Sequence, residues 1–378
     1  MLLFLSIIFG LFTLLESTPI FNEANGTVIV PTSFGYVRGL SIRSYDNRTG
    51  FAFFSVAFAE STDGPRRFAI PEPRKPWSGI RDATLKGMAC PAVPIVHKYQ
   101  ADAIIHNFAS DGQDVVVVVT EYRMATFGFL NLAPGRRDLS TDSNVCLHDL
   151  LVSLKWVQRN IAAFGGDPAR VTLSGYSAGS MLADLISISP SFNCLYSQLA
   201  FRSGTYSFTT APKETNVLTS WLTAELLGCA DVRTSRVETE SIERVVECMR
   251  KKSWQEIVHA RVSLDDHPEP LFQPHTDGEG GLFPDLFPEM AKKRSAVPIL
   301  MGTTTKETLI TQYALDDNRR VIMPRLEEMC MAVAYANNYS RPETPGKLCV
   351  EYYAQDDNVK SFTQTSSSMY RRYKLPSK

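Results

Sequence analysis

The residues with the clearest chemical capacity form the sequence G-Y-S-A-G at positions 175–179. A serine between two glycines at this spacing is typical of a nucleophile elbow, a sharp turn that presents the hydroxyl to a substrate. A serine hydroxyl alone is a poor nucleophile at neutral pH, so Ser177 needs a base, a group that orients the base, and oxyanion donors. The pattern predicts acyl transfer through Ser177, with the N–H of Ala178 as an oxyanion donor. The alternative is a small-residue turn that carries a solvated serine.

The flanking segments have the patterns of a strand and a helix. The run R-V-T-L-S-G at 170–175 predicts a strand, and A-G-S-M-L-A-D-L-I-S-I at 178–188 predicts a helix. Upstream, the β-branched run at 114–123 predicts a strand buried on both faces of a parallel sheet. A helix follows it, because apolar residues at spacings of four, three and four form one stripe. That stripe consists of Leu150, Leu154, Val157 and Ile161. The alternation of strand and helix indicates a mostly parallel α/β sheet.

The amino-terminal part has a different character. Residues 27–45 mix β-branched and polar residues around glycines, which predicts antiparallel strands. Residues 68–77 carry three prolines and are expected to form an extended surface segment.

The leader predicts a secretory route. Residues 1–18 are mostly apolar with no charge before Glu16, so we interpret them as a signal peptide. The alternative is a retained membrane anchor, because the leader begins without Lys or Arg. No second run of spanning length follows, so no membrane span is expected in the body. Three N-x-[ST] sequons, at Asn25, Asn47 and Asn338, favour a secreted or lumenal glycoprotein.

Composition limits the partners and cofactors. The net charge is -1, and no long basic run occurs, so nothing indicates binding to nucleic acid. No His/Cys/Asp cluster has metal-ligand spacing, and no metal or organic cofactor is expected. The chain has seven cysteines, an odd number, so at least one thiol stays unpaired. Proximity along the chain suggests the pairs Cys229/Cys248 and Cys330/Cys349, while the others fit equally well as small buried side chains.

Several blocks together resemble the type-B carboxylesterase family, which includes cholinesterases and invertebrate gut esterases. The block L-K-W-V-Q-R-N-I-A-A-F-G-G-D-P-A-R-V-T-L-S-G-Y-S-A-G-S at 154–180 is the most characteristic, and residues 53–60, 65–91, 116–130 and 281–311 are similar to further family segments. The resemblance implies an α/β-hydrolase fold and a small-molecule ester as substrate. It also implies that Glu307 is the catalytic acid, in a K-E-T sequence where the family has D-E-G.

Two parts of the family pattern are missing. No residue after Glu307 is histidine, although the family places its base there. His148, His267 and His275 are the alternatives considered for the base, each with low expectation. No Gly-Gly pair occurs between Cys90 and Asp114, where the family has its H-G-G-G oxyanion loop and a central strand. The neighbours of that strand are therefore expected to lack ladder partners, and Cys90 to lack its family disulfide partner.

We expect residues 19–378 to form one carboxylesterase-type domain that is incomplete, with weak or no turnover. One alternative is a noncatalytic secreted binding or adhesion protein on the same fold, similar to neuroligins. Another is an incomplete gene product that does not fold stably. The sequence leaves the particular ester and the oligomeric state open.

Overall fold

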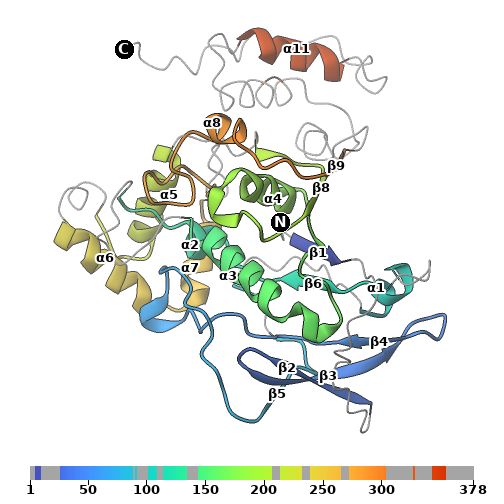
Figure 1. The fold of residues 1–378 in the computed structure, drawn as a ribbon. Coiled ribbons are helices and arrows are strands. Elements are labelled where there is room, and N and C mark those ends of the chain that lie inside the picture. Colours follow the sequence, from blue (N-terminus) through green and yellow to red (C-terminus); the bar gives the residue numbers. More distant parts are fainter. Residues whose placement is uncertain are drawn as a thin grey trace, which may run out of the picture. The chain divides into compact units, whose positions relative to one another are not determined.

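The structure is a computed structural model that describes residues 5–9, 26–87, 90–91, 101–108, 114–133, 144–206, 213–231, 239–264, 272–303, 327 and 343–354. The chain divides into two compact units, residues 1–301 and 302–378, and each is described by itself (Figure 1). The first unit contains both sheets and the segment around Ser177.

The main sheet of the first unit has five strands in the order β6-β1-β7-β8-β9. Strands β7 and β8 are paired and run parallel, so their carboxyl ends meet at the same edge of the sheet. The strand bounds, in the order of the sheet, are Val117–Thr120, Leu5–Phe9, Val171–Tyr176, Gln198–Arg202 and Ile299–Gly302.

Strand β1 occupies the place between β6 and β7 and runs antiparallel to both. Leu5 lies opposite Thr120 on one side and opposite Gly175 on the other. The expectation that the neighbours of the missing family strand lack ladder partners is therefore wrong. Unpaired buried backbone groups cost about 1–3 kcal/mol each, which explains why a leader segment with the apolar sequence L-S-I-I-F can fill the gap. The prediction of a signal peptide at residues 1–18 stays a prediction.

A second sheet lies below the main sheet in the view of Figure 1. Strands β2 (Thr27–Thr32), β3 (Gly35–Arg43) and β4 (Thr49–Ala52) form an antiparallel meander. Strand β5 (Ile80–Asp82) pairs with β3 in the parallel direction. The prediction of antiparallel strands in residues 27–45 is confirmed.

The helices of the first unit pack around two apolar clusters. Helices α3 and α4 share one cluster with β7, β8 and α8, and helices α2, α5, α6 and α7 share the other. The helices α1 to α8 span, in order, Ala101–Phe108, Ala125–Phe129, Val145–Asn160, Ala178–Ile188, Lys213–Leu226, Thr239–Lys251, Trp254–Val262 and Phe287–Ala291. In the second unit the structure describes helix α11, Glu343–Ala354.

The apolar stripe predicted for the helix is buried, whereas the strand predicted to be buried on both faces is only half-buried. The four stripe residues, three on α3 and Ile161 in the turn directly after it, are at most 1% exposed, as the helical spacing predicts. Strand β6 is shorter than predicted, and its three valines are only half-buried. The sheet order gives the reason, because β6 is an edge strand with a neighbour on one side only.

Candidate active site

Ser177 lies at the junction between β7 and α4. It follows the last residue of the strand and is the N-cap of the helix, with φ 55° and ψ −128°. A positive φ is strained for a residue with a Cβ, and such strain concentrates at functional sites. The predicted position of Ser177 at a strand-to-helix turn is confirmed, whereas its catalytic role stays a prediction.

Glycines allow the backbone to approach itself closely at this turn. A Cβ at Gly175 would lie 2.2 Å from the carbonyl oxygen of Gly179. A Cβ at Gly204, which follows β8, would lie 2.5 Å from the carbonyl oxygen of Ser177. Both distances are far shorter than van der Waals contact, so the turn needs glycine at these two positions. The sequence pattern revealed the first glycine but not the second.

Three backbone hydrogen bonds fix the turn. The N–H of Ser177 donates to the carbonyl oxygen of Arg202 at 2.9 Å, which ties the serine to the end of β8. The carbonyl oxygen of Ser177 accepts from the N–H groups of Ser180 and Met181 at 2.8 and 3.1 Å, the first turn of α4. Ser177 stays partly exposed in this arrangement.

Ala178 is the first residue of α4 and is also partly exposed. The first N–H groups of a helix have no partner within the helix, and the helix dipole favours negative charge there. This N–H can therefore donate to an oxyanion that forms at the serine. Its role as an oxyanion donor stays a prediction.

The predicted acid and two histidines cannot be placed relative to the elbow, since Glu307, His97 and His267 lie outside the described residues. Among the histidines that the structure describes, His106 lies on α1 with its Nδ1 3.5 Å from a carboxylate oxygen of Asp46.

Two of the other described histidines lie on helices. His148 is in the first turn of α3 and half-buried, and His259 is exposed on α7.

His275 is the most deeply buried of the described histidines, at 5% exposure. Its two ring nitrogens each lie 3.0 Å from a side-chain amide nitrogen, Nε2 from Asn131 and Nδ1 from Asn216. The side chain of Asn144 forms two hydrogen bonds with the backbone of His275. It accepts from the N–H at 3.1 Å and donates to the carbonyl oxygen at 2.7 Å. We call these four residues the His275 cluster. Amide contacts at both ring nitrogens leave this imidazole poorly suited to act as a base.

A buried ion pair links the segment after β6 to helix α3, and the sequence patterns do not reveal it. Arg123 donates to both carboxylate oxygens of Asp149, with the shortest contact at 2.7 Å. Both side chains are about 5% exposed, and Arg123 also donates to the carbonyl of Ala69 at 2.8 Å. No local pattern reveals such a pair, because its partners are separated by 26 positions in the chain.

The cysteines fall into two groups. The predicted pair Cys229/Cys248 is confirmed as a disulfide. Cys349 is also disulfide-bonded, while its predicted partner Cys330 lies outside the described residues. Cys90 carries a free thiol.

Two further described thiols, Cys146 and Cys194, are also free, and the first of them is buried. Burial raises the pKa of the Cys90 thiol to about 12, and the charges of Glu121 and Asp149 act in the same direction. Burial likewise holds the pKa of Cys146 well above its usual value.

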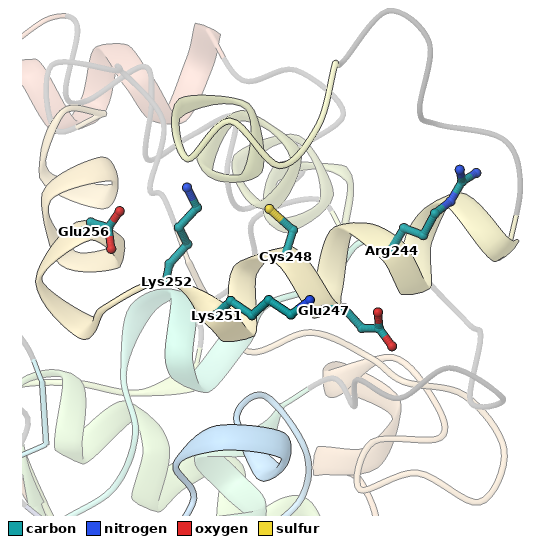
Figure 2. Close-up of a pocket in the computed structure, with 6 residues that line it drawn as sticks. All are labelled: Arg244, Glu247, Cys248, Lys251, Lys252 and Glu256. Atoms are coloured by element: carbon teal, nitrogen blue, oxygen red, sulfur yellow. The ribbon is translucent and has the colours of Figure 1, made fainter.

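A surface hollow of about 520 Å³ lies beside the disulfide, on α6 and α7 (Figure 2). It contains none of the residues of the elbow. Its sulfur, on Cys248, is already disulfide-bonded, and Glu256 caps α7 through Ser253. The hollow is lined by Arg244, Glu247, Cys248, Lys251, Lys252 and Glu256. Charges of both signs and the lack of a reactive group make it a poor candidate for the active site.

The described part of the chain shows neither a metal-binding cluster nor a membrane-spanning helix. Within the described residues, no three or more His, Cys, Asp or Glu side chains gather in a way that could hold a metal ion. None of the helices in the same part of the chain is long and apolar enough to cross a membrane.

The chain is similar to several known ester-cleaving and related hydrolases by name. The chain is 27% identical to an acylcarnitine hydrolase of Rattus norvegicus over 93% of this chain and 70% of that protein. It is 29% identical to an acylcarnitine hydrolase of Mus musculus over 66% of this chain and 52% of that protein. It is 26% identical to esterase FE4 of Myzus persicae over 76% of this chain and 57% of that protein. The chain thus spans between about half and 70% of the length of these relatives.

A family model agrees with these similarities across nearly the whole chain. The model of the carboxylesterase family matches residues 26–104 and 95–375, and this family has the α/β-hydrolase fold. The chain belongs to the carboxylesterase family.

Proposed function

We propose that this protein is a serine hydrolase whose Ser177 is acylated by a carboxylic ester. The observation that carries the proposal is the strained turn of Ser177, with φ 55° at the carboxyl end of a strand and the start of a helix. Maintaining such a turn requires glycine at two neighbouring positions, and a solvated serine in an ordinary turn requires neither. Membership of the carboxylesterase family supports the same reaction.

The proposed reaction has two halves. The Oγ of Ser177 attacks the carbonyl carbon of the ester, the carbonyl oxygen becomes an oxyanion beside the N–H of Ala178, and the alcohol leaves. Water then attacks the acyl group on Ser177, which releases the acid and regenerates the hydroxyl. Glu307 is the proposed acid of this site, by its position in the family pattern. The reaction needs no metal or organic cofactor.

Removal of the proton from Ser177 is the weak step of this proposal. No histidine follows Glu307, and His275 has an amide at each ring nitrogen. In a well-studied protease, loss of the base alone costs about 10⁶ in kcat, and loss of one oxyanion donor costs a further 10²–10³. A chain that consists of residues 1–378 alone is therefore expected to be acylated slowly and to turn over little.

The test is covalent labelling of Ser177 with a fluorophosphonate probe, read by mass spectrometry of the labelled peptide. We expect slow labelling of the wild type, no labelling of this peptide in Ser177→Ala, and unchanged labelling in Ser295→Ala. Ser295 is a suitable control because its hydroxyl is exposed and bonds to Asn193 instead of lying at a turn. A folded wild-type protein that is never labelled at Ser177 would contradict the proposal.

The pH dependence of labelling shows whether another group acts as the base. Without a base, the rate follows the serine alkoxide and rises about tenfold per pH unit through neutrality. A histidine base would give a curve that rises and then levels off around the usual histidine pKa of about 6.5. We expect the first form, and Ser295→Ala is expected to give the same curve as the wild type.

A second candidate function is noncatalytic binding on the same fold. The absence of a Gly-Gly pair between Cys90 and Asp114 favours it, because a binding protein needs no oxyanion loop. Unlabelled protein that is monodisperse and unfolds cooperatively in urea supports this function. Unlabelled protein without a cooperative transition supports the third hypothesis, an incomplete product that does not fold.

We also propose that the protein enters the secretory route. The disulfide between Cys229 and Cys248 supports this, because disulfides persist in oxidising compartments. Asn47 of the second sequon is exposed in a turn, as a glycosylated asparagine has to be. Asn25 and Asn338 lie outside the described residues. A shift in mass on treatment of the secreted protein with a glycosidase, absent in Asn47→Gln, tests this site.

A further inference from the structure

An arginine lies immediately beside the elbow on the neighbouring strand. Arg202 is the last residue of β8 and is paired in register with Tyr176, the residue before Ser177. Its carbonyl oxygen accepts the hydrogen bond from the N–H of Ser177 at 2.9 Å. The backbone position of Arg202 is therefore fixed relative to the nucleophile, and Figure 1 shows β8 with α4 at this part of the sheet.

The side chain of Arg202 is directed to the exposed side of this edge. Its guanidinium carbon lies 6.0 Å from the centre of the Tyr176 ring, a cation–π distance. The tyrosine is 54% exposed, and Arg202 is exposed as well. This contact with the neighbouring ring limits the directions that the guanidinium can take and holds its charge over Tyr176, the residue before Ser177.

Some arginines of the described chain are engaged by carboxylates. Arg67, Arg74, Arg123 and Arg294 each contact a carboxylate within 4.0 Å. Arg202 has no such contact with a carboxylate in the part of the chain that the structure describes. The guanidinium beside the nucleophile thus keeps its hydrogen-bond donors available to a ligand, at the strand edge where α/β sheets bind ligands.

We propose that Arg202 is a specificity-determining residue that favours esters carrying a carboxylate near the scissile bond, such as half-esters of dicarboxylic acids. This proposal rests on the proposed acylation of Ser177. A guanidinium presents a planar set of donors that matches a carboxylate at two points, and such charge-assisted bonds are stronger than neutral ones. Because the site is exposed, we expect a preference on the order of tenfold over the neutral ester. Salt at 1 M should reduce it, because the screening length falls to about 3 Å.

The first experiment compares two fluorophosphonate probes of equal length, one ending in a carboxylate and one ending in a neutral amide. The measured quantity is the ratio of their labelling rates at Ser177. We expect the wild type to favour the anionic probe, Arg202→Gln to lose the preference, and Arg202→Lys to keep part of it. The matched control is Arg170→Gln, because Arg170 is exposed and precedes the opposite end of β7. An unchanged ratio in Arg202→Gln, or an equal change in Arg170→Gln, overturns the proposal.

A second experiment separates this proposal from the proposed function. Saturation-transfer NMR measures binding of succinamate, an anion, and of neutral succinamide to the unlabelled full chain. We expect selective binding of the anion that is lost in Arg202→Gln and retained in Arg170→Gln. If neither probe labels Ser177, the proposed function fails, and this binding result alone decides the role of Arg202. Equal binding of the two compounds to the wild type overturns that role.

Discussion

The elbow of Ser177 and the His275 cluster each hold a side chain capable of acid–base or nucleophilic chemistry, but they treat it in opposite ways. At the elbow, backbone hydrogen bonds and two glycines fix the turn while the serine stays partly exposed. In the cluster, amide groups contact both ring nitrogens of a histidine that is 5% exposed. The difference teaches that surroundings decide the role of a reactive residue type. One region leaves its reactive side chain partly exposed, and the other buries it among hydrogen-bonding partners.

The largest effect on stability is expected from Gly175→Ala. The added methyl group would lie 2.2 Å from a backbone oxygen of α4, which cannot move without displacing the helix. We expect a loss of more than about 3 kcal/mol in the free energy of unfolding, measured by urea denaturation, or failure to fold. Gly302→Ala is the control, because no atom lies within 4 Å of its Cβ position. A Gly175→Ala protein as stable as this control would show that the elbow is less tight than described.

A smaller effect is expected from His275→Ala. This change removes one partner from each of two buried amides. The Asn216 amide keeps its hydrogen bond to the carbonyl of Gln273, so the main cost comes from the Asn131 amide, and we expect a loss of about 1–3 kcal/mol. His259→Ala is the control, since that side chain is exposed on α7. Labelling of Ser177 per folded molecule should stay unchanged in both variants. Loss of labelling in folded His275→Ala would instead make this histidine part of the site and end the contrast between the two regions.

The smallest effect concerns the thiols, which extend the comparison to a third kind of reactive group. Cys194 is exposed, whereas burial raises the pKa of Cys90 to about 12. At pH 8 the thiolate fraction of Cys90 is then on the order of 10³ times smaller than that of an ordinary thiol. We expect iodoacetamide to modify Cys194 first in the native protein and both thiols equally in urea, as measured by peptide mass spectrometry. Rapid native modification of Cys90 would contradict its burial.

The raised thiol pKa also sets a direction for stability against pH. The folded protein keeps the proton on Cys90 up to a pH of about 12, while the unfolded chain loses it near pH 8.5. The stabilising contribution of this group is therefore complete below about pH 8.5 and decreases as the pH rises through the interval up to about 12.

Local patterns predicted the elements that depend on neighbours along the chain. The stripe of α3, the turn of Ser177 and the Cys229/Cys248 disulfide all follow from spacing over a few to about twenty residues. The sequence could not reveal that Leu5 pairs with Gly175, because a short apolar segment fits a leader and a strand equally well. The half-burial of β6 depends on its place in the sheet, which local periodicity does not contain.

Only part of the candidate site could be predicted from the sequence. Gly175 is visible in the motif, but Gly204 acts on Ser177 from another strand, and nothing in the residues around it indicates that contact. The engagement of His275 was equally hidden, since its two amide partners are 144 and 59 positions away. Close approach and hydrogen-bond saturation are properties of the folded chain.

The His275 cluster also has a consequence for the integrity of the molecule. It joins chain segments from positions 131, 144, 216 and 275, and the stretch after it contributes Leu282 and Phe283 to the same core as α3 and α4. A protease that cut once between residues 264 and 272 would sever the covalent connection but none of these contacts. The two fragments would remain associated, and they would separate only when a denaturant disrupted the hydrophobic core that they share.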